Sequence, residues 1–291
     1  MAWVESASPS FRARHESTHA DEVDRVLYSL ERTREYMAQY FPHTVDGISV
    51  VFHPSVASLS VACPMVPVAW VLAAPAARRY VGGWSGRQDL HVLLPDSLEA
   101  RASTVPGSAE MLERTAPALY ARRVILANNA SLGRRMTPLR MSAELRWAWL
   151  LEGAARWFGG QTAHARPAIA RRLREGRRPA FPPGMRDAPL LGGTVIDLLV
   201  QERGERAAAQ LACRLHRQGA RAALREAFGS RSQSQIEQDW RAHLTRMAAA
   251  AQKPSAHDLA RQPHDQRADR QGHEQPGEQA ARRDHRRRRL A

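Results

Sequence analysis

Glu152 is the residue of this chain whose type and surroundings best suit chemistry. It lies in the segment WAWLLEGAARWFGGQ, residues 147–161, at the edge of an apolar face with helical spacing. That face consists of Trp147, Leu150, Leu151, Ala154 and Phe158. A carboxylate in this position can bind a metal ion, and it can equally form a salt bridge with Arg156 one turn later.

Three histidines are candidate helpers for a metal site at Glu152. His164 follows twelve residues later, beyond a Gly-Gly pair, and would have to fold back to become a ligand. His53 and His91 lie in two β-rich runs, where the ordinary interpretation is a histidine on the face of a strand. No histidine lies between His91 and His164, so the segment before Glu152 offers no imidazole.

The composition indicates a globular chain with an arginine bias. It has 291 residues, of which 43% are hydrophobic, and a formal net charge of +14. Lys253 is the only lysine, which indicates a bias toward GC-rich codons more than a nucleic-acid-binding surface. Cys63 and Cys213 form no disulfide framework, and they favour a reducing cytoplasm.

The sequence predicts neither a secretory signal nor a membrane span. The N-terminal residues lack the apolar region of a signal peptide. The longest apolar run, 61–77, contains three prolines and is shorter than the roughly 20 residues of a spanning helix. It predicts a buried core segment, helical or extended, in a cytoplasmic protein.

The hydrophobic patterns predict an α+β fold in two parts between two tails. Residues 1–18 are polar and unpatterned, which predicts a disordered tail. An α+β part at 19–165 and a helical part at 166–252 follow. The first is expected to hold a helix at 20–41, a strand at 47–53, a hairpin or a turn and strand at 79–94, a long helix at 108–128, a polar linker to Pro138 and the helix of Glu152. The second is expected to hold a short basic helix after His164 and helices at 192–203, 206–218, 220–228 and 234–250.

Residues 253–291 predict a second disordered tail. They are rich in Gln, Arg, Asp and His and have almost no apolar content. Arg282, Arg283 and the run 286–289 suggest one alternative function, which is binding to nucleic-acid phosphates or to an acidic partner. A solubilising tail in an arginine-biased chain is the simpler interpretation.

The order of these elements, together with WLLEGAARWFGGQ, resembles the zincin-like metallopeptidases, and most closely the peptidase-MA-like domains of gluzincin type. Helical phrases from Gly192 to Trp240 resemble the helical subdomain of that family, so the likeness spans about residues 20–250. The resemblance implies a small sheet with helices and a helical C-terminal subdomain. It also implies that Glu152 stands at the position of the third zinc ligand.

The zinc motif of that family is missing from this chain. An active gluzincin carries H-E-x-x-H on the preceding helix, where two histidines one turn apart bind zinc and the glutamate activates the bound water. The corresponding segment here is LYARRVILANNASL. Under slightly different alignments, the ligand positions fall on Tyr120, Val124, Ala127 and Asn128. Because none of these is a good zinc ligand, Glu152 is expected to be a relic without a cofactor.

The expected function is therefore that of a catalytically inactive zincin-like protein. Its cleft would bind a peptide or protein partner, and an edge strand of the sheet would offer main-chain hydrogen bonds. The alternative is an active metallohydrolase with an atypical site around Glu152, in which zinc would bind only if His164 rebuilt the ligand set.

Overall fold

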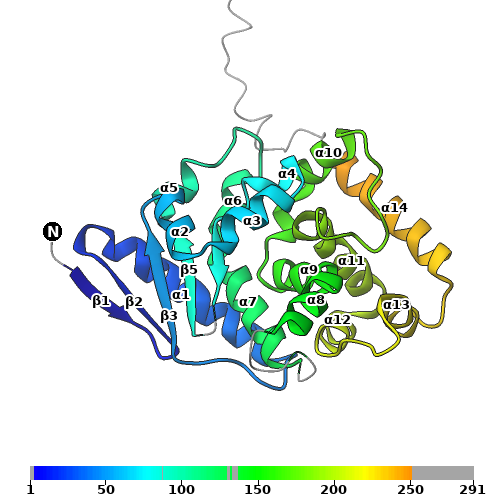
Figure 1. Ribbon diagram of the computed structural model, residues 1–291, viewed down its shortest axis with the longest axis horizontal. Helices are drawn as coiled ribbons and strands as arrows, with labels where there is room; N and C mark the ends of the chain where they lie inside the picture. The colour runs from blue at the N-terminus through cyan, green and yellow to red at the C-terminus, as the bar shows by residue number, and fades with distance from the viewer. Residues whose placement is uncertain (1–2, 87, 130–131, 133–136, 251–291) are drawn as a thin grey trace, which may run out of the picture. The chain divides into compact units, whose positions relative to one another are not determined.

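The computed structural model describes residues 3–86, 88–129, 132 and 137–250. Residues up to Gln252 form one compact unit, and the expected tail at 253–291 lies outside the described residues. The fold is α+β, as predicted. A small sheet lies near the N-terminus and a helical part follows it (Figure 1).

Five strands form one mixed sheet in the order β1-β2-β3-β5-β4. The bounds are β1 Trp3–Ala7, β2 Phe11–Glu16, β3 Ile48–His53, β4 Gly83–Ser85 and β5 Asp89–Leu93. The inner pairs β2–β3 and β3–β5 are parallel, whereas the outer pairs β1–β2 and β4–β5 are antiparallel. The predicted strand at 47–53 and hairpin at 79–94 are confirmed, and β4 stands at an edge.

The prediction of a disordered N-terminal tail is wrong, because β1 and β2 lie within residues 1–18. In β2, buried and exposed side chains alternate, which is the period of a strand with one covered face. Phe11 is buried on that face and meets the ring of Tyr120 edge-on at 5.1 Å. The segment is polar overall, and its alternation was the signal of a strand.

Helices of the first half surround the sheet. They are α1 Ala20–Ala38, α2 Val56–Ala62, α3 Met65–Leu72, α4 Pro75–Arg78, α5 Pro95–Glu99, α6 Ser108–Glu113 and α7 Thr115–Ala127, with a 3₁₀ turn η1 at Ser17–His19. α1 contacts β2 and α7, and α7 contacts β4 and β5. The helix predicted at 20–41 is confirmed as α1. The long helix predicted from Ser108 divides into α6 and α7 at Arg114.

The apolar run 61–77 is largely helical, as one of the two alternatives held, but the expected burial is only partly confirmed. Its buried residues are Cys63, Val66, Ala73, Ala74, Ala76 and Ala77. Only Val66 of α3 is fully buried. The exposed large side chains of this stretch are Val61, Met65, Val68, Val71 and Leu72. A helix that is apolar all round and still exposed is unusual, and such surfaces mark binding sites. Among the described residues, no helix has the length and apolar character to cross a membrane.

Helices of the second half form the rest of the unit (Figure 1). They are α8 Pro138–Arg146, α9 Ala148–Phe158, α10 Arg166–Arg174, α11 Ala188–Arg203, α12 Glu205–Ala212, α13 Ala220–Ala227 and α14 Gln233–Ala250, with a 3₁₀ turn η3 at Thr162–His164. The helices predicted after Gly192 are confirmed, although α11 begins earlier and α12 ends earlier than expected. α8 replaces the end of the predicted polar linker.

α9 and α11 pack backbone to backbone at two glycines. A Cβ at Gly153 would lie 2.4 Å from the carbonyl carbon of Gly192, and a Cβ at Gly192 would lie 2.5 Å from the carbonyl oxygen of Trp149. Both distances are far below van der Waals contact, so neither position accepts a side chain. This contact holds the helix that carries Glu152 in place.

Candidate functional site

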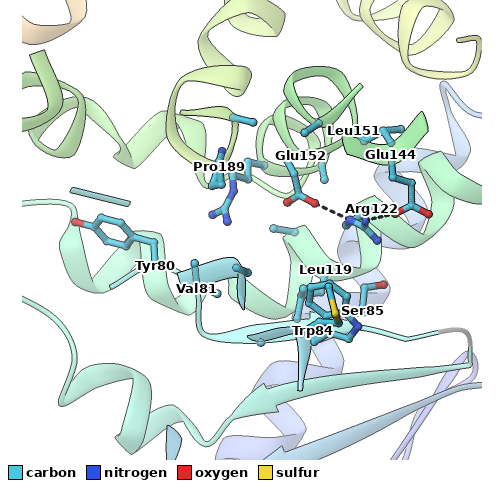
Figure 2. A pocket seen from close by; sticks show the side chains of 18 of the residues that line it. Tyr80, Val81, Trp84, Ser85, Leu119, Arg122, Glu144, Leu151, Glu152 and Pro189 are labelled. Carbon is cyan, nitrogen blue, oxygen red and sulfur yellow. Dashed lines mark hydrogen bonds and ion pairs between the residues drawn. The ribbon is translucent and has the colours of Figure 1, made fainter. Parts of the chain in front are cut away.

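A cleft of about 450 Å³ lies between β4, α3, α7, α8, α9 and the start of α11, and we call it the central cleft. Its walls are mainly apolar. They include Met65, Val68, Leu72, Leu119, Met141 and Leu145. Figure 2 shows Trp84 and Ser85 of β4 on one side and Leu151 and Glu152 of α9 on the other. An apolar hollow of this size with a few polar groups is typical of a ligand-binding site.

Arg122 of α7 joins the carboxylates of the central cleft. Its Nε donates to Glu152 Oε1 at 2.7 Å, and its Nη2 donates to Glu144 Oε2 at 2.8 Å. Figure 2 shows the guanidinium between the two glutamates. Arg140 Nε completes the network by donating to Glu144 Oε1 at 2.8 Å. The cluster therefore ties α7, α8 and α9 together at the cleft.

This arrangement corrects the expected salt bridge between Glu152 and Arg156. Both are one turn apart on α9, but the structure gives the direct bond of Glu152 to Arg122, thirty residues earlier in the chain. The reason is geometric, because α7 and α9 pack side by side and bring Arg122 up to the Glu152 carboxylate. Glu152 is a salt-bridge residue, as one alternative stated, with a different partner.

The Arg122 network is largely shielded from water. The side chains of Arg122, Glu144 and Glu152 are 14%, 13% and 29% exposed. Burial by itself lowers the pKa of Arg122, but the charges and hydrogen bonds of Glu152 and Glu144 outweigh it and raise the pKa above its ordinary value. The guanidinium is thus a permanent cation that neutralises carboxylate charge at the cleft.

Arg156 also lines the central cleft, and its guanidinium is incompletely paired. Its Nη1 donates to Gln161 Oε1 at 2.6 Å, and Gln161 is held in turn by its own bond to the carbonyl of Met111 at 2.9 Å. The Nε of Arg156 is buried and has no hydrogen-bond partner among the described residues. Burial lowers the pKa of Arg156, and the charge of Glu152 opposes this effect.

Four residues of α7 line the central cleft: Thr115, Ala118, Leu119 and Arg122. The residues proposed from alignment at the missing ligand positions point elsewhere. Tyr120 is fully buried and donates to the carbonyl of Val45. Asn128 binds the backbone of His43. Val124 and Ala127 are likewise not among the described lining residues.

The donor atoms of the central cleft do not fit a zinc site. Its described lining residues include neither histidine nor cysteine. Glu144 and Glu152 supply its carboxylates, and both bind Arg122. A protein zinc site normally uses three or four nitrogen, sulfur or carboxylate ligands, and a guanidinium offers no lone pair. His164 lies in η3 and does not line the cleft among the described residues.

The two strand histidines are brought together, but outside the central cleft. His53 Nε2 and His91 Nδ1 are 3.0 Å apart, and the two rings stack. His91 Nε2 lies 3.2 Å from Asp89 Oδ2. Burial, followed by the charge of His91, lowers the pKa of His53. The pair lies on one sheet face, and nothing in its geometry connects it with Glu152.

One other group of ligand-type atoms occurs among the described residues. His19, Glu22 and Asp96 each offer one such atom, and these atoms all lie within 4.8 Å of one another. They belong to the η1–α1 junction and to α5, away from the central cleft. Partly exposed acidic groups commonly lie this close together without a metal ion, so their proximity is not evidence of a metal site.

Sequence reasoning found Glu152 but missed its surroundings. Glu144 lies on α8, a helix that is missing from the predicted elements. The signal for this helix is the pair Thr137 and Pro138, a typical helix start in which Thr137 Oγ1 accepts from Arg140 N at 3.2 Å. Arg122 carried no signal of its own, because its role depends on how α7 packs. Comparison with known proteins finds no matching protein-family model, curated protein or solved structure.

Proposed function

We propose that this chain is a zincin-like domain without a catalytic metal, and that its central cleft binds an extended apolar segment of a polypeptide. One observation carries the proposal: the Arg122 guanidinium lies between Glu152 and Glu144 and binds both carboxylates. A cation of the protein itself thus occupies the place next to the glutamate where the resembling family binds zinc.

The spacing of the cleft-facing residues on α7 supports the resemblance. Ala118, Leu119 and Arg122 have the spacing i, i+1 and i+4, which is that of the two histidines and the glutamate in H-E-x-x-H. Under this alignment Ala118 and Arg122 stand in the place of the histidines and Leu119 in the place of the catalytic glutamate. None of the three can bind zinc or act as a general base.

The walls of the central cleft support a polypeptide ligand. β4 is an edge strand that pairs with β5 on one side, and Gly83, Trp84 and Ser85 line the cleft. Such an edge can receive an extended segment through main-chain hydrogen bonds. Ser85 Oγ is buried and has no hydrogen-bond partner among the described residues. The apolar walls from α3 and α8 would take the ligand's side chains.

Two measurements test this proposal. Elemental analysis of the purified protein should find zinc well below one equivalent, and a stoichiometric zinc content that is lost in Glu152→Ala would overturn the metal-free assignment in favour of an active hydrolase. Fluorescence anisotropy with labelled apolar peptides should show saturable binding that is competed by unlabelled peptide. Binding of none of a varied set of apolar peptides would remove the second half of the proposal.

A further inference from the structure

The central cleft contains a second cation with a different environment from Arg122. Arg122 is neutralised by two direct carboxylate partners. Arg156 has no carboxylate bound to it directly among the described residues; its one hydrogen bond goes to the neutral amide of Gln161. A partly buried cation without a directly bound carboxylate is unfavourable, because its buried N–H group has lost water and gained no partner in return. The site is therefore suited to an anion from outside.

The free edge of the Arg156 guanidinium indicates which anion fits. Nη1 is held by Gln161, and the edge formed by Nε and Nη2 has no hydrogen-bond partner among the described residues; its Nε is buried. Two parallel N–H groups on one edge match the two oxygens of a carboxylate. Gln161 fixes the orientation of that edge, because it is itself bound to the backbone of Met111.

The apolar walls of the central cleft indicate what kind of molecule carries the carboxylate. Val68, Leu119 and Leu145 line the same cleft and offer no partner to further charges. A ligand that suits both features is apolar along its length and carries a carboxylate at one end. The end of an apolar polypeptide meets this description, since its α-carboxylate is present whatever its side chains are.

We infer that the central cleft takes the C-terminal end of an apolar polypeptide, and that Arg156 binds its α-carboxylate through the Nε–Nη2 edge. This inference rests on the proposed function. It adds the direction in which the ligand enters and the group that is recognised. Arg122 has no part in this recognition, because Glu144 and Glu152 already use its guanidinium.

The test compares two forms of the same peptide on the full chain. Peptides with an N-terminal fluorescein, a polar spacer and four apolar C-terminal residues are made as the free acid and as the C-terminal amide. We expect the free acid to bind at least tenfold more tightly than the amide, since bonds between charged groups are strong in a shielded site. Arg156→Gln should abolish this preference, so that the free acid binds no more tightly than the amide does.

Controls separate the possible outcomes. Arg171→Gln changes an exposed arginine of α10 outside the cleft, and it should keep the full preference. Arg156→Lys keeps the charge without the two-pronged edge, and it should lose most of the preference; this variant serves if the glutamine variant does not fold. Equal binding of acid and amide overturns the inference and leaves the proposed function intact. Binding of neither form overturns the inference. If a varied set of apolar peptides also fails to bind, the peptide-binding half of the proposed function is overturned too, while the metal-free half is still decided by the zinc content. Binding of dodecanoate without binding of any peptide overturns the inference and the peptide-binding half alike.

Discussion

Arg122 Nε and Glu152 Oε1 lie 2.7 Å apart across the central cleft, and this bond links α7 to α9. The same guanidinium reaches Glu144 on α8, so one side chain joins three helices. This bond and the bond to Glu144 therefore connect the helices that form one side of the central cleft. The contribution of Arg122 to the fold can be measured as a change in the free energy of unfolding.

Replacement of Arg122 by leucine is expected to destabilise the fold. The change would leave two shielded carboxylates near each other without their common cation. We expect the free energy of unfolding to fall by about 2 kcal/mol, a value reduced for the partial exposure of Glu152. Urea unfolding followed by tryptophan fluorescence measures this change. The double variant Arg122→Leu/Glu152→Gln should be more stable than Arg122→Leu alone, since Glu144 keeps Arg140 as its partner and the unpaired carboxylate of Glu152 is gone.

Arg214 offers a matched control for that experiment. It pairs with Glu226 at 3.2 Å, but the two side chains are 67% and 59% exposed. Exposed pairs contribute little, so Arg214→Leu should change the free energy of unfolding by no more than about 0.5 kcal/mol. An Arg122→Leu variant as stable as Arg214→Leu would show that the network is not structural.

The phrase around Glu152 shows how far sequence reasoning reaches. Its apolar spacing located a buried helix correctly, because periodicity records which face is covered. The partner of Glu152 could not be obtained in this way. Arg156 is the nearest basic residue on the same helix and is therefore the partner that local spacing predicts. The observed partner is Arg122, and its approach depends on how α7 packs on α9. Local patterns determine helices, and packing determines which side chains meet.

Gly153 provides a test of the packing beneath Glu152. A Cβ at this position would meet the backbone of Gly192, which cannot move without shifting α11. We expect Gly153→Ala to lower the free energy of unfolding by about 2 kcal/mol, even though alanine favours helices. Gly184 is the matched control, since a Cβ there meets open space and its backbone lies outside the left-handed region. Gly184→Ala should be neutral or slightly stabilising, and urea unfolding of both variants measures the difference.

The His53–His91 pair predicts a pH dependence of stability. The pKa of His53 is lowered from about 6.5 in the folded state, first by burial and then by His91. Below about pH 6.5, His53 therefore binds a proton more readily in the unfolded chain than in the folded chain. For this reason the free energy of unfolding falls as the pH falls. One proton gives a slope of at most about 1.4 kcal/mol per pH unit. Urea unfolding at about pH 7.5 and about pH 5.5 measures the loss.

Substitution at His53 isolates its part of that dependence. His53→Gln removes the titrating group, so the difference in stability between the two pH values should be smaller than in the wild type. His43 is exposed, and His43→Gln should leave the wild-type difference unchanged. An equal pH dependence in the wild type and His53→Gln would assign the loss of stability to other groups.

The error about the apolar run 61–77 has a physical origin. Hydrophobic composition predicts burial because the removal of apolar side chains from water is favourable. On α3 that expectation fails, because no element in the described part of the chain covers Val68 and Val71. An apolar segment that its own fold covers and one that stays exposed can have the same hydrophobic composition, so composition alone does not distinguish them.

Val68 tests whether this exposed apolar surface belongs to the binding site. Its side chain is 43% exposed and lines the central cleft, whereas Val61 in the same stretch is 84% exposed and is not among the described lining residues. Aspartate at either position should leave the free energy of unfolding within about 0.5 kcal/mol of the wild type, because both sites face water. Val68→Asp should weaken binding of the labelled apolar peptides about tenfold, since the new carboxylate loses water on binding and also repels the ligand's terminal carboxylate. Val61→Asp should bind as the wild type does. Equal affinities of the two variants in anisotropy titrations would mean that α3 is not a wall of the peptide site.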